Sequence, residues 1–311
     1  MPLSEFSLIE RFFTKQTIIN PSTQLSIGDD CALLSIPQAY QLAITCDTMV
    51  ENVHFFAGTN AKQLGHKLLA VNLSDLASMG AKPLSVTLAL TLPSINEQWL
   101  SDFSEGFLNL ARYYHVDLIG GDTTKGALTL TVQAMGLIPQ GQALKRSNAQ
   151  AGDFIYVSGN IGDAGLGLKI CQGYQCTDKE NALNRFNKPM PRVEIGQALL
   201  GIANSCIDIS DGLVSDLGHI LKQSGVGACL YWESIPLSSA VIDYITNTHD
   251  ELMPLIAGDD YELCFTVSPD KAHLVPEQCF KIGVIEKDAG LRLIKNNKIQ
   301  TLTAKGYEHF S

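Results

Sequence analysis

Hydrophobic and polar positions alternate along the stretch from Leu84 to Leu92. Its even-numbered residues are Leu or Val, and its odd-numbered residues are Ser, Thr or Ala. A period of two puts the two sets on opposite faces of an extended chain, which predicts a half-buried strand. Residues 61–79 instead carry apolar side chains at spacings of three and four, which predicts a helix that ends before Gly80 and Pro83.

The same reasoning predicts alternating helices and strands along the rest of the chain. In the first half, it gives a helix from a capping-box pattern at Ser7 through Phe13, strands at 42–46, 116–119 and 128–135, and a helix from Ser94 to about Tyr114. In the second half, it gives strands at 154–158, 206–209, 227–232, 261–267 and 280–285, and helices at 163–172, 192–203 and 213–223. Residues 181–192 are polar and contain two prolines, so they are predicted to form an exposed loop. This order of elements indicates an α/β fold in layers.

Length and composition indicate a globular protein of two domains. A chain of 311 residues suggests two domains, since domains have about 150 residues each. Residues 139–142 are polar and contain Pro and Gly, so the predicted domains are 1–138 and 139–311. The net charge of −10 argues against nucleic acid as a partner, because phosphate backbones are bound by Lys and Arg.

Other features of the sequence bear on where the protein works. No apolar stretch approaches the roughly 20 residues that cross a bilayer, so no membrane association is expected. The N-terminus has no basic segment of the kind that begins a signal peptide. The eight cysteines contain no C-x-x-C pair, so they are expected to be mostly buried, reduced thiols in the cytoplasm.

Aspartates recur beside Gly, Ser or Thr at the ends of predicted elements. They stand at positions 29, 30, 47, 75, 122, 208, 211, 259 and 260. Two such charges about 4 Å apart repel by roughly 4 kcal/mol at an effective dielectric of 20. If they gather in one cleft, cations must lie between them, and Mg²⁺ with phosphates is the natural choice. The sequence therefore predicts a magnesium-dependent phosphoryl-transfer site; it has neither a P-loop nor the protein-kinase motifs.

Each of these motifs also has a structural interpretation. Asp after Gly is common in turns, and Ser210 or Asp211 would serve as a cap for the helix predicted at 213–223. Asp75 on the helix predicted at 61–79 either faces solvent or meets a cation, and the pattern alone does not decide between the two. Arg146 either grips phosphate or belongs to a solvated Lys-Arg pair.

Six motifs in this order and spacing carry a family resemblance. They span residues 27–32, 47–55, 72–83, 120–124, 208–213 and 258–263. With them the chain resembles, over essentially its whole length, the thiamine-monophosphate kinases, which share a superfamily with aminoimidazole ribonucleotide synthetase and selenophosphate synthetase. The resemblance implies a two-domain aminoimidazole ribonucleotide synthetase-like α/β (α+β) fold, dimerising through the N-terminal domain. It also implies ATP-dependent phosphorylation of thiamine monophosphate to thiamine pyrophosphate.

The resemblance further implies roles for individual residues. Magnesium ligands would be Asp30, Thr45, Cys46, Asp47, Asp75, Asp122, Asp208 and Asp211. ATP would contact Gly121, Asp122, Arg146 and Ser210, and the thiamine substrate would contact His54, Glu262 and Tyr307. The family usually has Ser or Thr where Cys46 stands, and a thiol is a poor Mg²⁺ ligand, so Cys46 would ligate only through its carbonyl oxygen. Glu105 stands where the family can have an ATP-facing Tyr, and it is left out because Glu cannot stack on adenine.

The chemistry implied by the resemblance needs no general base. A phosphate monoester has a second pKa of about 6 and is largely dianionic at neutral pH. What it needs is charge neutralisation and in-line alignment by several magnesium ions, without a phospho-enzyme. His54 would position the substrate. Three alternatives remain. One is a selenophosphate synthetase or an aminoimidazole ribonucleotide synthetase, although the first cysteine, Cys31, argues against the selenium enzyme. The others are a hydrogenase-assembly relative, although the chain ends in Ser311, and a nucleotide-binding protein without turnover.

Overall fold

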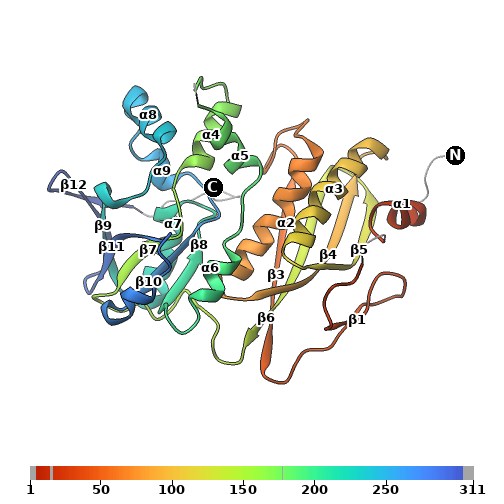
Figure 1. The fold of residues 1–311 in the computed structure, drawn as a ribbon. Coiled ribbons are helices and arrows are strands. Elements are labelled where there is room, and N and C mark those ends of the chain that lie inside the picture. Colours follow the sequence, from red (N-terminus) through yellow and green to blue (C-terminus); the bar gives the residue numbers. More distant parts are fainter. Residues whose placement is uncertain (1–4, 15–16, 177, 304–311) are drawn as a thin grey trace. The chain divides into compact units, whose positions relative to one another are not determined.

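The computed structural model describes residues 5–14, 17–176 and 178–303, which form two compact units (Figure 1). Unit 1 contains the residues up to Leu76 together with 81–141, and unit 2 contains 77–80 and the residues from Gln142 onward. Each unit has its own sheet and helices, and the two are described separately below.

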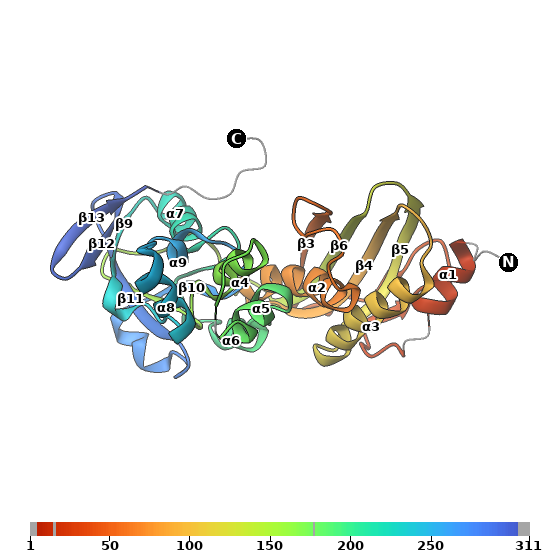
Figure 2. The ribbon, with the colours of Figure 1, turned by 90° about the horizontal axis from the view of Figure 1, so that it is seen from above.

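Unit 1 is built on a four-stranded sheet in the order β3-β6-β4-β5. These strands are β3 (Tyr40–Val50), β4 (Lys82–Leu92), β5 (Asp117–Lys125) and β6 (Thr129–Pro139), and the helices are α1 (Glu5–Phe12), α2 (Ala61–Ser78) and α3 (Glu97–Tyr113). A small antiparallel pair, β1 (Thr23–Leu25) and β2 (Leu33–Leu34), precedes them. Parallel strands β4 and β5 are joined through α3, as parallel pairing requires a long crossover. Helices α2 and α3 lie along one face of the sheet (Figure 2).

The alternation in β4 and the periodicity in α2 build the core of unit 1. Val86, Leu88 and Leu90 are at most 4% exposed, whereas the positions between them are less buried. The apolar positions of α2 are likewise buried, so both predictions are confirmed. The helix predicted from Ser94 begins instead at Glu97, because the Asn96 side chain accepts a hydrogen bond from the Trp99 N–H and caps the first turn.

Unit 2 is built on a seven-stranded sheet in the order β13-β12-β9-β11-β7-β10-β8. Its strands are β7 (Phe154–Val157), β8 (Ser205–Asp208), β9 (Gly227–Tyr231), β10 (Leu263–Val267), β11 (Phe280–Glu286), β12 (Gly290–Lys295) and β13 (Lys298–Leu302). Its helices are α4 (Asp163–Cys171), α5 (Glu180–Asn187), α6 (Val193–Ala198), α7 (Leu213–Ser224), α8 (Ser239–Thr248) and α9 (Met253–Ile256), with short 3₁₀ turns η1 (Trp232–Ser234) and η2 (Pro269–Leu274). Only the β9–β12 pairing is parallel among those of the described strands of this sheet.

The main core of unit 2 lies between α7 and this sheet. Leu213, Leu217 and Ile220 of α7 are fully buried in one cluster with Ile155 and Leu230 of the strands. A second cluster lies among α4, α5 and α8 and includes Leu166 and Val241. Burial of these side chains holds α7 against the sheet and so fixes the loop that leads into it.

The prediction of an exposed loop at residues 181–192 is wrong, because most of this segment forms α5. Ala182 and Phe186, four residues apart, are both buried on one side of this helix. At Gly167, α4 approaches so closely that an added Cβ would lie 2.4 Å from the Ala182 carbonyl oxygen. Polar residues on the outer face of α5 conceal this short apolar stripe in the sequence.

Other boundaries also differ from the sequence prediction. Helix α1 begins at Glu5, so Ser7 lies inside it and does not cap it, and α6 is shorter than the helix predicted at 192–203. Strand β10 begins at Leu263, because Asp259 and Tyr261 have left-handed backbone angles. The cysteines are all free, but three are exposed and three buried, so they are not mostly buried as expected.

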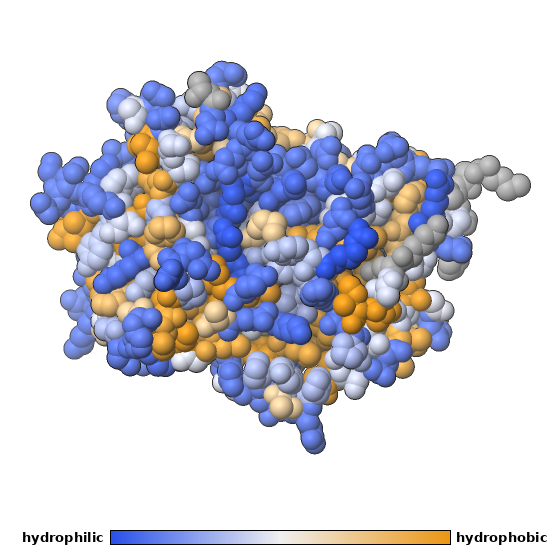
Figure 3. All heavy atoms as spheres, viewed as in Figure 1, coloured by the Kyte–Doolittle hydropathy of each residue, from blue (hydrophilic) through white to orange (hydrophobic). Residues whose placement is uncertain are grey.

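Surface properties agree with a globular chain. Hydrophilic residues cover most of the helical region of the face drawn in Figure 3. None of the described helices has both the length and the apolar character needed to cross a membrane.

Candidate functional site

Strand β3 and helix α2 bring three predicted metal ligands of unit 1 together. Thr45 and Asp47 lie on the side of β3 that faces α2, where Thr45 donates a hydrogen bond from its hydroxyl to the Asp75 carboxylate. The Asp47 N–H donates to the Asn72 side chain at 3.1 Å, which links the same strand to the same helix. Cys46 points to the opposite face, since successive residues of a strand alternate, and its side chain is exposed.

The two carboxylates affect each other. Burial, followed by the neighbouring Asp75 charge, raises the pKa of Asp47 from 3.8 to about 6. Asp75 is half-buried and bonded to Thr45, so it does not simply face solvent. Two crowded carboxylates beside a hydroxyl are hard oxygen donors whose repulsion a cation relieves, and this donor set fits Mg²⁺.

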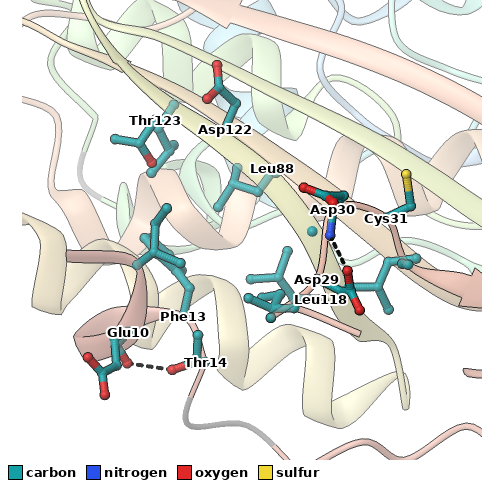
Figure 4. A pocket seen from close by; sticks show the side chains of 18 residues that line it. Glu10, Phe13, Thr14, Asp29, Asp30, Cys31, Leu88, Leu118, Asp122 and Thr123 are labelled. Carbon is teal, nitrogen blue, oxygen red and sulfur yellow. Dashed lines mark hydrogen bonds between the residues drawn. The ribbon is translucent and has the colours of Figure 1, made fainter. Parts of the chain in front are cut away.

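A cavity of about 630 Å³ lies in unit 1 between α1, the segment Ile27–Ala32 and strands β4 and β5. Asp30 and Asp122 lie on the two sides of Leu88 in Figure 4, with Phe13 and Leu118 nearby. The Asp30 N–H donates to the Asp29 carboxylate at 2.9 Å, which closes a local turn. The cavity therefore combines an apolar wall with exposed carboxylates.

The register of the sheet separates these two groups. Asp47, Val132, Leu88 and Gly121 share one row across the four strands. Three steps of about 4.8 Å between strands put Asp47 roughly 14 Å from Gly121. Asp122 belongs to the next row, opposite Ala89. Across residues 5–14, 17–176 and 178–303, no three His, Cys, Asp or Glu side chains gather closely enough to hold a metal by themselves.

Gly121 lies inside β5, not after a strand as predicted. Its φ of +156° and the close approach of β4 explain this: an added Cβ would lie 1.9 Å from the Leu88 carbonyl oxygen. Glycine at this position lets β4 and β5 continue pairing through Asp122. The sequence suggested that the strand ends before Gly120 and Gly121, because glycine usually weakens a strand.

Replacing Gly121 with alanine is expected to lower the free energy of unfolding of unit 1 by about 1–3 kcal/mol, because the added methyl overlaps backbone. Gly120→Ala is the matched control: its nearest neighbour, the Thr87 methyl, is 3.7 Å away. Urea unfolding of both variants, followed by Trp99 fluorescence in a Trp232→Phe background, measures the difference. Equal free energies of unfolding for the two variants would contradict the prediction and show that the β4 backbone shifts to accommodate the added methyl group.

In unit 2, a loop between β8 and α7 holds three further predicted site residues. Asp208 ends β8 and is 3% exposed, and Ser210 and Asp211 follow it. The N-cap of α7 is Gly212, and no side chain caps the helix, so neither Ser210 nor Asp211 has the capping role considered above. The N–H groups of Ser210 and Asp211 instead donate to one carboxylate oxygen of Asp216, each at 3.0 Å.

The charges of two predicted site residues act on Asp216. Burial raises its pKa to about 7, against the effect of the two N–H groups. The Asp211 carboxylate raises this pKa further, and the Arg146 guanidinium lowers it. Arg146, Ser210 and Asp211, which the resemblance connects with ATP and metal, are therefore neighbours of one buried carboxylate.

Glu262, the predicted substrate contact of unit 2, lies in a buried network of charged side chains. Its side chain is fully buried and lies 2.6 Å from Arg185 and 2.7 Å from the Nε of Arg192, and Ser158 donates to it at 2.5 Å. The structure thus places the Glu262 carboxylate inside unit 2, where it pairs with two arginines. Its position in the chain gives no sign of this, since Arg185 and Arg192 lie in the segment predicted to be a loop.

Asp260 is buried at the start of α4. It accepts hydrogen bonds from the N–H groups of Gly162 at 2.8 Å and Ala164 at 3.3 Å. Burial raises its pKa from 3.8 to about 8 despite these bonds. The aspartate of this motif therefore has a structural partner within unit 2.

This raised pKa predicts a pH dependence of stability. Between pH 3.8 and about 8 the folded protein keeps a proton on Asp260 that the unfolded chain releases, so its contribution to stability falls as pH rises. Asp260→Asn does not titrate, so its stability relative to wild type should rise by up to about 1.4 kcal/mol per pH unit. Urea unfolding from pH 5 to 8, with the exposed Asp243→Asn as control, tests this; a difference independent of pH would contradict it.

The remaining predicted contacts are His54 and Tyr307. His54 is half-buried after β3, and its Nδ1 accepts a hydrogen bond from the Val50 N–H at 3.0 Å. Tyr307 lies outside the described residues. The sequence reasoning missed Asp216, although an acidic residue among the apolar positions of the helix predicted at 213–223 was a usable signal.

Comparisons with known proteins cover nearly the whole chain. Residues 28–138 match the AIR synthase related protein N-terminal domain, and residues 150–296 match the corresponding C-terminal domain. The chain is 46% identical to the thiamine-monophosphate kinase of Haemophilus influenzae over 100% of this chain and 99% of the relative. It is 34% identical to that of Bacillus subtilis over 99% and 100%.

Solved structures agree with these relatives. A thiamine-monophosphate kinase from Stenotrophomonas maltophilia is 42% identical with a TM-score of 0.86, covering 94% of this chain and 97% of that one. A structure described as AaThiL complexed with AMPPCP and TMP is 26% identical with a TM-score of 0.80, covering 89% of each chain. The predicted two-domain α/β fold and the family resemblance are confirmed, and the chain belongs to the thiamine-monophosphate kinases of the AIR synthase related superfamily.

Proposed function

We propose that this protein uses ATP to phosphorylate thiamine monophosphate, giving thiamine pyrophosphate and ADP. The observation that carries the proposal is the 46% identity with a thiamine-monophosphate kinase over the full length of both chains. A relative whose structure is described as a complex with AMPPCP and TMP supports the same pair of substrates. Because the reaction consumes ATP, we place it in the cytoplasm.

The residues of this chain suit transfer from one phosphate to another. The acceptor phosphate is already an anion at neutral pH, so the site need not remove a proton from it. The proposed transfer is direct and in line, and it requires that two anions be held close together. No described side chain is therefore assigned as a general base.

The proposed magnesium ligands divide between the two units. In unit 1 they are the Asp47–Asp75 pair with Thr45, the carbonyl oxygen of Cys46, and Asp30 and Asp122 beside the cavity. In unit 2 they are Asp208 and Asp211. Bound Mg²⁺ would neutralise phosphate charge, and these residues would hold it through oxygen alone, which matches its preference. Gly121, Arg146 and Ser210 are proposed to contact ATP.

His54 is proposed to position the substrate. Because its Nδ1 already accepts a bond from the Val50 N–H, this nitrogen is not available to remove a proton from the substrate. This arrangement suits a hydrogen bond to an acceptor atom of the substrate better than removal of a proton. Glu262 and Tyr307 stay proposed substrate contacts.

A product assay tests the proposed function. Purified protein is incubated with Mg-ATP and thiamine monophosphate, and thiamine pyrophosphate is measured by chromatography. Unphosphorylated thiamine and an aminoimidazole ribonucleotide precursor serve as control acceptors. Formation of thiamine pyrophosphate only with the monophosphate is expected, and turnover of a control acceptor alone would move the assignment to another branch of the superfamily.

We also propose that the protein is a homodimer formed through unit 1. Helices α2 and α3 lie on one face of its sheet, whereas Ile44, which is 56% exposed, Cys46 and Thr48 are exposed on the other face. An apolar side chain on an open sheet face supports a protein partner there. Light scattering should give twice the chain mass of 33.7 kDa, and Ile44→Arg should shift the species toward the monomer.

A further inference from the structure

Asp216 is a buried carboxylate that the family resemblance leaves without a role. It lies in the first turns of α7 and is 2% exposed. A buried carboxylate costs several kcal/mol unless its environment compensates for the lost water. It does not cap its helix, so its position needs another reason.

The contacts of Asp216 supply that reason. One of its oxygens accepts hydrogen bonds from two consecutive N–H groups, those of Ser210 and Asp211, each at 3.0 Å. Two converging N–H groups fix the backbone angles between them more tightly than one bond does. The carboxylate therefore defines the conformation of the turn that carries Ser210 and Asp211.

The other side of this turn is also held. The Ser210 carbonyl oxygen accepts from the Asp259 N–H at 2.9 Å, and the Ile209 carbonyl oxygen accepts from the Tyr261 N–H at 2.8 Å. Gly258 leaves room for this contact, since an added Cβ would lie 2.2 Å from the Ser210 carbonyl oxygen. The turn thus lies between the Gly258–Tyr261 segment, which bonds to it through backbone groups, and Asp216, which bonds to it through its side chain.

We propose that Asp216 is a positioning residue, which holds the Ser210–Asp211 turn in the conformation that phosphate transfer requires. The proposal rests on the proposed function for the nature of the reaction, but its hydrogen bonds are independent of it. Asp216 acts through the turn, from whose two N–H groups it accepts hydrogen bonds, and it does not itself touch the reacting atoms.

Three variants separate positioning from general stability. Asp216→Ala removes the acceptor of both N–H groups, whereas Asp216→Asn keeps a carbonyl oxygen that can accept them. Asp153→Ala is the matched control in the same unit. Asp153 is 3% exposed and accepts from the Gln150 N–H at 2.9 Å and from the Asn204 amide at 3.0 and 2.9 Å.

The kinetic measurement is kcat and KM for ATP, together with the Mg²⁺ concentration that gives half-maximal rate. A shift of about 1 Å in a positioned group lowers a rate by about 100-fold, and we expect a loss of that order in kcat for Asp216→Ala with a raised Mg²⁺ requirement. Asp216→Asn should stay within about fivefold of wild type, since it keeps the acceptor. Asp153→Ala should lose less than about threefold at a comparable loss of stability.

Hydrogen exchange tests the geometry without relying on activity. In Asp216→Ala, exchange of the segment 209–212 should become at least about tenfold faster, and in Asp153→Ala it should not change. If the wild-type protein shows no kinase activity, the proposed function is contradicted. The exchange measurement still tests whether Asp216 holds the turn through its hydrogen bonds.

Several results would overturn the proposal. Wild-type kinetics and exchange in Asp216→Ala would do so, as would equal losses of activity in Asp216→Ala and Asp153→Ala. If Asp216→Ala does not fold, Asp216→Asn decides: a folded variant with near-normal rate and Mg²⁺ dependence supports positioning by the hydrogen bonds, and a loss of about 100-fold contradicts it.

Discussion

Replacing Asp75 with asparagine is expected to lower the rate of phosphate transfer by at least about 1,000-fold, which corresponds to about 4 kcal/mol. Asp75 stands beside Asp47 and Thr45, and its charge adds to the effect of burial in raising the pKa of Asp47. In the proposed site, their joint negative charge would attract a divalent cation to this part of unit 1. Asparagine keeps the shape and a hydrogen-bond acceptor for Thr45 but removes one charge, so the loss should come from the cation and not from folding.

The control for this variant is Asp102→Asn. Asp102 is also a half-buried aspartate on a helix of unit 1, and it accepts a hydrogen bond from the Gln98 amide at 2.9 Å. We expect it to keep wild-type activity. Both variants are compared by thiamine pyrophosphate formation over a range of Mg²⁺ concentrations, with urea unfolding as a check of the fold. An Asp75→Asn enzyme within tenfold of wild type would remove Asp75 from the set of metal ligands.

The second large effect is expected on stability. Glu262→Gln should lower the free energy of unfolding of unit 2 by about 3–5 kcal/mol, because it leaves two largely buried arginines without their counter-charge. The side chain of Glu262 is 0% exposed, and those of Arg185 and Arg192 are 16% and 30% exposed. Glutamine occupies the same volume, so the loss reports the charge and not a cavity.

Glu286→Gln is the matched control for this measurement. Glu286 pairs with Arg292 in the same unit, but the two side chains are 36% and 25% exposed, and such pairs contribute at most about 1 kcal/mol. Each unit contains one tryptophan, so Trp232 fluorescence in a Trp99→Phe background follows unit 2. If Glu262→Gln costs no more than Glu286→Gln, then the buried network does not hold the segment from α5 to α6.

The consequence for function is that Glu262 and Asp216 act in similar ways. Each is a buried carboxylate that fixes other groups: Glu262 holds two arginines, and Asp216 holds two backbone N–H groups. Asp259 and Tyr261, in left-handed conformations, connect the two arrangements through their bonds to Ser210 and Ile209. Strained backbone of this kind persists where the surroundings determine it, which is common near functional sites.

Local periodicity predicted the elements whose packing is simple. The helix predicted at 61–79 is α2 at Ala61–Ser78, and the strand predicted at 84–92 lies within β4. In both, one face is consistently apolar and becomes the buried face, so pattern and packing agree. Helix α5 was not predicted because only Ala182 and Phe186 form its buried side, which is too short an apolar pattern to detect. Strands β12 and β13 were also not predicted.

The sequence by itself determined the family and the set of acidic residues, because six motifs in a specific order identify both. It also predicted that any carboxylates brought close together would need a cation between them, since like charges repel. Only the tertiary structure decided which carboxylates have which partners. Asp47 meets Asp75 because α2 packs on β3, whereas Glu262 and Asp260 are enclosed in unit 2 by segments distant in the chain. The local sequence around an aspartate in a turn does not show whether its carboxylate is open to a cation or enclosed by structural partners. Burial and hydrogen bonding depend on neighbours that are distant in the sequence.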